Sequence, residues 1–194
     1  SFLQGWKDEN GVEVNSGRMN LGVVTVNLPR IALESEGDLN KFWEIFNERM
    51  NIAEDALVYR VERTKEATPA NAPILYQYGA FGRRLGKEES VDQLFKNRRA
   101  TVSLGYIGLY EVATVFFGNS WESNPEAKEF TLDIIRDMKR RVEEWSDQYG
   151  YHFSIYSTPS ESLTDRFCRL DTEKFGSIPD ITDKEYYTNS FHYD

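Results

Sequence analysis

A run of hydroxyl side chains, S-T-P-S-E-S over 157–162, follows an apolar strand and opens a helix. The free N–H groups and positive dipole end of a helix N-terminus attract phosphate, and serine and threonine hydroxyls add donors. The same letters also fit an ordinary capping box, with Thr158 as N-cap, Pro159 in the first turn and Glu161 as its partner. Both interpretations stay open. The residues that could contact a substrate here are Ser157, Thr158, Ser160, Glu161 and Ser162.

A second polar turn, G-R-M-N-L-G, lies between Gly17 and Gly22 and leads into the apolar run 23–28. The amide of Asn20 can both donate and accept hydrogen bonds, as a ribose hydroxyl or a carboxylate would require. Asparagine is equally common as a turn-forming residue. Asn20, with Arg18 beside it, is therefore a candidate substrate contact, and an ordinary turn is the alternative.

Other chemistry-bearing residues favour structural roles. Cys168 lies in the middle of a helix, in R-F-C-R-L, and we expect a buried, inert thiol. His152 alternates with apolar strand residues and is also expected to be structural. The carboxylates Glu34, Glu36 and Asp38 could form an acid/base set, but a solvated, capped helix start is the expectation.

Composition narrows the function classes. The 194 residues suffice for one domain with a core, and their formal net charge of −9 argues against nucleic-acid binding and against an anionic membrane surface. One cysteine allows no internal disulfide, and two histidines give no zinc cluster. No apolar run reaches the roughly 20 residues of a membrane span. A reducing, cytoplasmic setting is expected.

Strands and helices alternate along the chain. Apolar runs predict strands over 23–28, 74–78, 101–106, 151–156 and 186–192. Apolar stripes and caps predict helices over 38–64, 90–98, 109–117, 124–149 and 158–174. Asn10-Gly11 predicts a hairpin turn, and the basic loop Gly79–Gly86 lacks the spacing of a phosphate loop. The fold class is α/β, with a largely parallel sheet or barrel.

Four segments together carry a family resemblance. They read N-L-G-V-V-T-V-N-L-P-R-I-A-L-E-S, S-L-G-Y-I-G-L-Y-E, Y-S-T-P-S-E-S-L-T-D-R-F-C-R-L-D-T-E-K-F-G and Y-Y-T-N-S-F-H. In this order they resemble the central part of the large subunit of anaerobic, class III ribonucleoside-triphosphate reductases. The resemblance implies part of a ten-stranded α/β barrel of the glycyl-radical enzyme and ribonucleotide reductase type. Residues 1–194 would be a single fragment of it, with 1–22 as the descending arm of the finger loop and 23–194 as alternating strands and helices.

The same resemblance implies radical chemistry for the intact enzyme. A separate activase that uses S-adenosylmethionine and a 4Fe–4S cluster makes a glycyl radical, which oxidises a finger-loop cysteine to the thiyl. The thiyl removes the ribose 3′ hydrogen, the 2′-hydroxyl leaves as water, and formate is the usual reductant. The family cysteine stands in G-C-R-S-F-L, so it is expected two positions before Ser1, and Cys168 does not take its role.

Site residues and partners also follow from the resemblance. Asn20 matches the family asparagine beside the substrate, and 157–162 resembles the segment that binds substrate phosphates. The fragment itself would hold no cofactor, because structural zinc and the ATP and dNTP effectors belong to other parts of the family chain. A homodimer is implied, and the fragment is expected to be inactive alone. Two alternatives remain: a structural scaffold and subunit-contact segment, or another glycyl-radical enzyme of the formate-lyase type.

Overall fold

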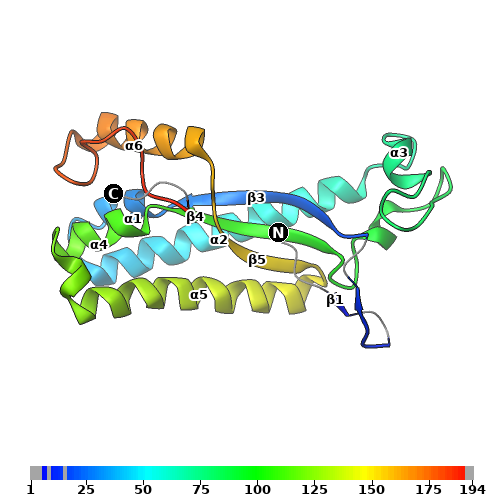
Figure 1. Ribbon diagram of the computed structural model, residues 1–194, viewed down its shortest axis with the longest axis horizontal. Helices are drawn as coiled ribbons and strands as arrows, with labels where there is room; N and C mark the ends of the chain where they lie inside the picture. Colours follow the sequence, from blue (N-terminus) through cyan, green and yellow to red (C-terminus); the bar gives the residue numbers. More distant parts are fainter. Residues whose placement is uncertain (1–5, 8–9, 15–16, 191–194) are drawn as a thin grey trace. The chain divides into compact units, whose positions relative to one another are not determined.

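The computed structural model describes residues 6–7, 10–14 and 17–190 (Figure 1). Its backbone packing divides the chain into two compact units. Unit 1 comprises Ser1–Val24, Glu54–Leu104 and Arg140–Ser154, and unit 2 comprises Thr25–Ala53, Gly105–Lys139 and Ile155–Asp194. The long strands and helices pass from one unit into the other. Each unit therefore contains one end of these elements, and the prediction of a single barrel fragment stays a prediction.

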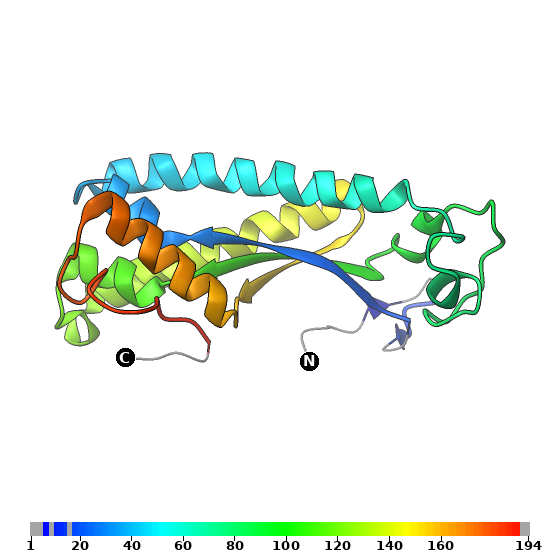
Figure 2. The same cartoon turned by 90° about the horizontal axis from the view of Figure 1, so that it is seen from above.

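The main sheet has three parallel strands in the order β3-β4-β5 (Figure 2). They are β3 (Met19–Asn27), β4 (Ala100–Ile107) and β5 (His152–Ser157). A parallel pair needs a long crossover, and helices supply it here. A separate antiparallel pair, β1 (Trp6–Lys7) and β2 (Glu13–Val14), sets Trp6 opposite Val14 around the predicted Asn10-Gly11 turn. The α/β class with a parallel sheet is confirmed.

The two longest helices begin where the sequence predicted their caps. The helix bounds are α1 (Leu28–Glu34), α2 (Leu39–Lys65), α3 (Pro73–Tyr76), η1 (Val91–Leu94), α4 (Leu109–Phe117), η2 (Trp121–Ser123), α5 (Pro125–Tyr149) and α6 (Glu161–Phe175). Asp38 Oδ1 accepts the Asn40 N–H at 2.8 Å, and Asn124 Oδ1 accepts the Glu126 N–H at 2.9 Å. Both side chains satisfy donors that a helix start leaves unpaired, as expected.

Two predicted strands are wrong. Residues 74–78 lie in and after the short helix α3, because Pro73 fits a first helical turn and Ile74 is 73% exposed, so this apolar run is not a buried strand. Residues 186–190 are irregular, because the Thr188 N–H donates to the Glu111 side chain instead of a strand ladder. The rest of that prediction, 191–192, lies outside the described residues.

Two predicted helices are shorter than expected. The stretch 90–98 contains only the 3₁₀ turn η1, which Ser90 caps by accepting the Asp92 N–H at 3.3 Å. Helix α6 begins at Glu161 with Ser160 as N-cap, so the prediction of Thr158 as N-cap is wrong. The physical reason is a competing partner: the Thr158 hydroxyl bonds to Thr25 instead.

Buried aromatic side chains pack against one another within each unit. In unit 2, aromatic rings from α2, α4 and α5 meet edge to face, with centroids 5.2 Å apart for Phe42 and Phe130 and 5.6 Å for Phe42 and Phe116. In unit 1, Phe153 packs 6.0 Å from Trp145. The Tyr151 hydroxyl there donates to Asp92 at 2.5 Å, and burial, together with this bond, raises the pKa of Tyr151 to about 12. Across the described residues, no helix combines the length and the apolar character needed to cross a membrane.

Candidate active site

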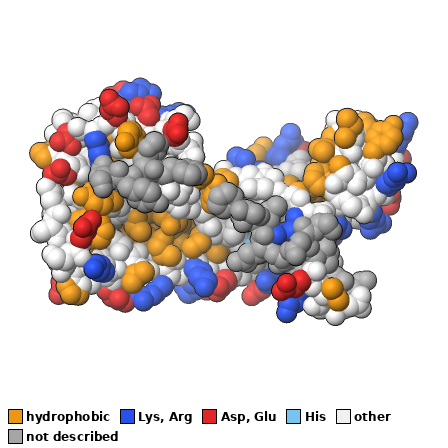
Figure 3. Space-filling model, viewed as in Figure 1, with side chains coloured by type: hydrophobic (Ala, Val, Ile, Leu, Met, Phe, Trp, Pro, Cys, Tyr) orange, Lys and Arg blue, Asp and Glu red, His pale blue; other side chains and the backbone are white. Residues whose placement is uncertain are grey.

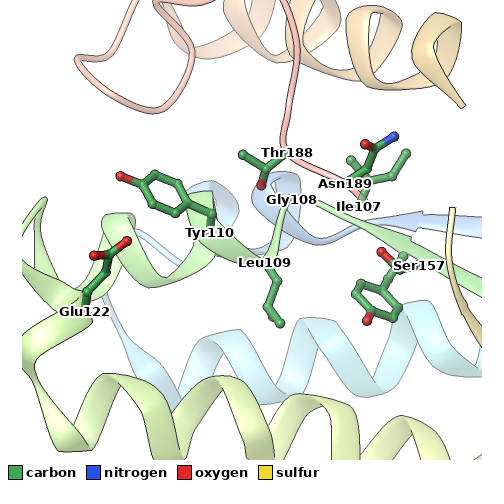
Figure 4. A pocket seen from close by; sticks show the side chains of 9 residues that line it. Ile107, Gly108, Leu109, Tyr110, Glu122, Ser157, Thr188 and Asn189 are labelled. Atoms are coloured by element: carbon green, nitrogen blue, oxygen red, sulfur yellow. The ribbon is translucent and has the colours of Figure 1, made fainter. Parts of the chain in front are cut away.

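A cavity of about 300 Å³ lies in unit 2, where β4 and β5 end (Figure 4). The carboxyl ends of parallel strands are where α/β sheets bind their ligands. Aromatic, hydroxyl, amide and carboxylate groups all line this cavity. Its lining residues are Tyr106, Ile107, Gly108, Leu109, Tyr110, Glu122, Ser157, Thr188 and Asn189.

One wall of the cavity is the irregular segment that carries Thr188 and Asn189 (Figure 4). The Gly108 N–H donates to the Thr188 carbonyl at 2.9 Å, and Asn189 Nδ2 donates to the Thr158 carbonyl at 3.0 Å. Neither residue is among the candidates that the sequence suggests. The sequence T-N-S at 188–190 could have indicated an irregular polar segment, because three consecutive polar residues do not fit a buried strand.

Thr158 lies between β5 and α6 and makes its hydrogen bonds inside the protein. Its side chain is buried, and its hydroxyl lies 2.9 Å from that of Thr25. Its N–H donates to the Tyr106 carbonyl at 3.1 Å. Through these bonds Thr158 holds the strand end in place and does not cap the helix.

A surface cleft lies at the start of α6. Pro159, Ser160, Glu161 and Ser162 line a shallow cleft of about 500 Å³, and the N-cap Ser160 makes no side-chain cap hydrogen bond. The Ser160 and Ser162 hydroxyls lie 3.5 Å apart. The first-turn N–H groups and the helix dipole favour an anion here, whereas the Glu161 carboxylate opposes one. Ser157 contributes to the neighbouring 300 Å³ cavity instead.

Tyr106 lines the 300 Å³ cavity with an uncharged phenol group. Burial raises the pKa of Tyr106, and a side-chain hydrogen bond with Ser157 acts in the opposite direction. The hydroxyl therefore stays protonated at neutral pH and can donate a hydrogen bond.

Asn20 belongs to unit 1, on β3, and its side chain is exposed. Its Oδ1 accepts the Gly22 N–H at 2.9 Å, which is the local bond of a turn-forming asparagine. Near it in sequence, Arg18 has a buried Nε without a hydrogen-bond partner among the described residues, and burial lowers its pKa. The role of Asn20 beside a substrate stays a prediction.

Asp171 lies on α6, the helix that begins at the candidate phosphate site, and bonds to other parts of unit 2. Its fully buried carboxylate accepts Asn27 Nδ2 at 3.0 Å and the Tyr187 hydroxyl at 2.7 Å, and it forms an ion pair with Arg30 Nε. Because Asn27 and Arg30 flank the start of α1, this network joins α1 to α6.

The remaining candidates have structural partners. Cys168 is fully buried, its Sγ lies 3.2 Å from the Lys184 carbonyl, and burial raises its pKa to about 11, so the buried thiol is confirmed and its inertness stays a prediction. Glu34 pairs with Arg49 at 3.0 Å and with Lys174 at 2.8 Å. Within the described ranges, no group of three or more His, Cys, Asp or Glu side chains could hold a metal ion.

A parallel sheet with a cavity at the carboxyl ends of its strands places the chain in the α/β class. A sequence profile of the anaerobic ribonucleoside-triphosphate reductase family matches residues 1–194, and the chain belongs to this family. It is 48% identical over 195 residues to the anaerobic ribonucleoside-triphosphate reductase of Escherichia coli K12, covering 100% of this chain and 27% of that protein. It is 48% identical to that of phage T4, covering 99% of this chain and 31% of that protein.

The chain is also similar to solved structures of anaerobic ribonucleotide reductases. The anaerobic ribonucleotide reductase of Thermotoga maritima with citrate in its active site superimposes with a TM-score of 0.70 at 26% identity, over 96% of this chain and 32% of that one. The same enzyme in complex with dATP and CTP gives a TM-score of 0.69 at 26% identity, over 96% of this chain and 29% of that one. The chain thus spans about a third or less of the relatives it matches.

Proposed function

We propose that the protein carrying this chain reduces ribonucleoside triphosphates to deoxyribonucleoside triphosphates, and that the chain is a substrate-binding segment of its catalytic barrel. The observation that carries the proposal is the family match over all 194 residues, with 48% identity to two reductases from different sources. A relative solved with dATP and CTP supports nucleotide binding by this fold. The match also favours a reductase over the formate-lyase alternative.

The finer features belong to the same proposal. The three parallel strands would be part of a ten-stranded barrel, with residues 1–22 as the descending arm of its finger loop. The enzyme would be a cytoplasmic homodimer that a radical S-adenosylmethionine activase switches on, with formate as reductant. The glycyl and thiyl radicals would supply removal of the ribose 3′ hydrogen. This chain's own part is to bind and orient the nucleotide.

Two contacts, one in each unit, are proposed separately. The amide of Asn20 would hydrogen-bond ribose hydroxyls or formate, as its donor and acceptor allow. The start of α6 would hold phosphates through the first-turn N–H groups of Glu161 and Ser162 and the hydroxyls of Ser160 and Ser162. Thr158 would fix the strand end from inside, and Ser157 would face the 300 Å³ cavity.

A scaffold role is the second candidate function. It is favoured by Thr158, whose backbone N–H, carbonyl and hydroxyl all have partners within the protein. In this alternative, α6 packs the barrel and every substrate contact is made elsewhere.

The double substitution Ser160→Ala with Ser162→Ala in the full-length enzyme separates the two candidates. Loss of two hydroxyl donors to a phosphate should raise the KM for a ribonucleoside triphosphate by about tenfold or more, while kcat changes less. Steady-state kinetics of the activated enzyme measure this. Ser123→Ala is the matched control, because Ser123 donates only to the Ser120 carbonyl at the exposed turn η2. An unchanged KM in the double variant would support the scaffold role.

Asn20→Ala tests the second contact. Removing an amide that orients the reacting ribose should lower kcat by about a hundredfold, because positioning errors act directly on the chemical step. The glycyl radical content, measured by electron paramagnetic resonance, should stay at the wild-type level. Asn51→Ala, on an exposed position of α2, is the control. Wild-type turnover in the Asn20 variant would rule out its assigned role.

A further inference from the structure

Glu111, in the first turn of α4, is a buried carboxylate that none of the roles above uses. Its side chain has no exposed surface. A buried charge is costly unless ionic and hydrogen-bond partners compensate it. A negative charge at a helix N-terminus is favourable, but this alone does not explain why the carboxylate is turned inward.

Three compensating partners come from one short segment of the described chain. Glu111 Oε1 accepts the Thr188 N–H at 2.9 Å and forms an ion pair with Lys184 Nζ at 2.8 Å. Glu111 Oε2 accepts the Thr188 hydroxyl at 2.7 Å. One carboxylate therefore satisfies a backbone donor, a hydroxyl and an ammonium group from residues 184–188.

The last two residues of the segment 184–189 form part of the cavity wall, and the segment has no regular secondary structure of its own. Thr188 and Asn189 line the 300 Å³ cavity, opposite residues at the start of α4 (Figure 4). Lys184 also lies 5.2 Å from the ring centroid of Tyr110, another lining residue. The bonds to Glu111 thus act together with those from Gly108 to the Thr188 carbonyl and from Asn189 to the Thr158 carbonyl to fix the position of the wall.

We propose that Glu111 is a positioning residue that holds the segment Lys184–Asn189 in place, and that it thereby sets the affinity of this cavity for the nucleotide substrate. The inference rests on the proposed function, because it takes the cavity to be part of the nucleotide site. Without the carboxylate, the wall would sample other positions and the cavity would bind the same ligand less tightly.

The test is Glu111→Gln in the full-length enzyme. Glutamine keeps the shape but loses the charge opposite Lys184 and one acceptor oxygen. The Kd for a ribonucleoside triphosphate should rise about tenfold, and KM with it, while kcat per active enzyme stays within about threefold. Amide hydrogen exchange over 184–190 should accelerate. Glu129→Gln is the control, because Glu129 forms its ion pair with Arg136 on an exposed face of α5.

A second pair of variants covers the case in which the glutamine variant does not fold. Thr188→Val deletes the hydroxyl that donates to Glu111, and Thr188→Ser retains it. The valine variant should bind nucleotide more weakly than the serine variant and exchange faster over 184–190. Equal Kd values in this pair, or a wild-type Kd in Glu111→Gln, would overturn the positioning role. A wild-type enzyme that binds no ribonucleoside triphosphate would instead contradict the proposed function.

Discussion

At the scale of one residue, Asp171 is a buried carboxylate whose charge is compensated by hydrogen-bond and ionic partners within unit 2. Three donors, on Asn27 and Arg30 at the start of α1 and on Tyr187 near the C-terminus, converge on its carboxylate. Burial is the larger cause that raises the pKa of Tyr187, and the Asp171 carboxylate raises it further, so the phenol stays a donor at any physiological pH.

Asp171→Asn should therefore destabilise the protein strongly. The amide removes the charge opposite Arg30 and leaves that guanidinium without its ionic partner, which costs up to about 3 kcal/mol because Asp171 is buried and Arg30 is partly exposed. Denaturant unfolding of the full-length protein, followed through the transition that involves α6, measures the loss. Asp133→Asn is the control, because its pair with Arg136 on α5 is exposed and should contribute little. Equal stabilities of the two variants would contradict this account.

The local sequence predicts the structural role of a residue well where its hydrogen-bond partners are near in the chain. The caps Asp38 and Asn124 bond to residues two positions away, so propensity and geometry agree. The cap predicted at Thr158 is wrong because the hydroxyl that competes for it belongs to Thr25, 133 positions earlier. Glu111 could not be singled out for the same reason, since its partners lie more than seventy positions away in the chain.

At the scale of elements, α4 meets α1 at a close backbone approach. Gly108, the N-cap of α4, has a φ of +81°, and a Cβ placed there would lie 2.2 Å from Pro29 Cγ. Only glycine fits both the left-handed backbone and the proline ring. This contact fixes the helix start that presents Glu111 and Tyr110.

Gly108→Ala should consequently destabilise the protein through two effects, a left-handed backbone that costs about 1–2 kcal/mol and a steric clash with Pro29 worth roughly 1–3 kcal/mol. Gly118→Ala, at the other end of the same helix, is the comparison without a clash, because a methyl group added there would meet nothing within 4 Å. Its φ of +74° and ψ of −178° are essentially confined to glycine, so its variant carries a backbone cost of about 1–3 kcal/mol. Thermal unfolding of both variants in the full-length protein measures the two losses. A loss at Gly108 of no more than about 1 kcal/mol would show that α1 can move away from α4.

Periodicity predicts the elements that carry a long stripe or a continuous apolar run. The prediction for α4 matches to the residue, and those for β3, β4 and β5 match within a few positions. The prediction is wrong at 186–190, where tyrosines resemble a strand but the Thr188 backbone donor is used by a side chain. The cavity wall could not be predicted for this reason, because its conformation is set by tertiary bonds.

At the scale of the whole molecule, the sheet leaves β3 and β5 each with one strand neighbour among the described residues. An unpaired strand edge is a template for further pairing. Unit 2 also presents hydrophobic side chains on the face seen in Figure 3, with charged residues at the margins.

The isolated 194-residue chain should therefore self-associate in solution. Sedimentation velocity over a range of concentrations would show mass increasing with concentration for the chain alone. Lysine substitutions at the exposed apolar positions Leu132 and Leu170 should reduce the association. A monomer at every concentration would contradict the open-edge argument.

The strand order has a consequence for how the chain is made. The bond between Thr25 and Thr158 closes only after 133 further residues have been synthesised, which takes on the order of ten seconds on a ribosome. During that interval β4 can pair with β3 but has no partner on its other edge. Contacts so distant in sequence also slow the folding reaction itself. The emerging chain is thus most vulnerable to misassembly between the synthesis of β4 and that of β5, and slowing translation within α5 would prolong that period.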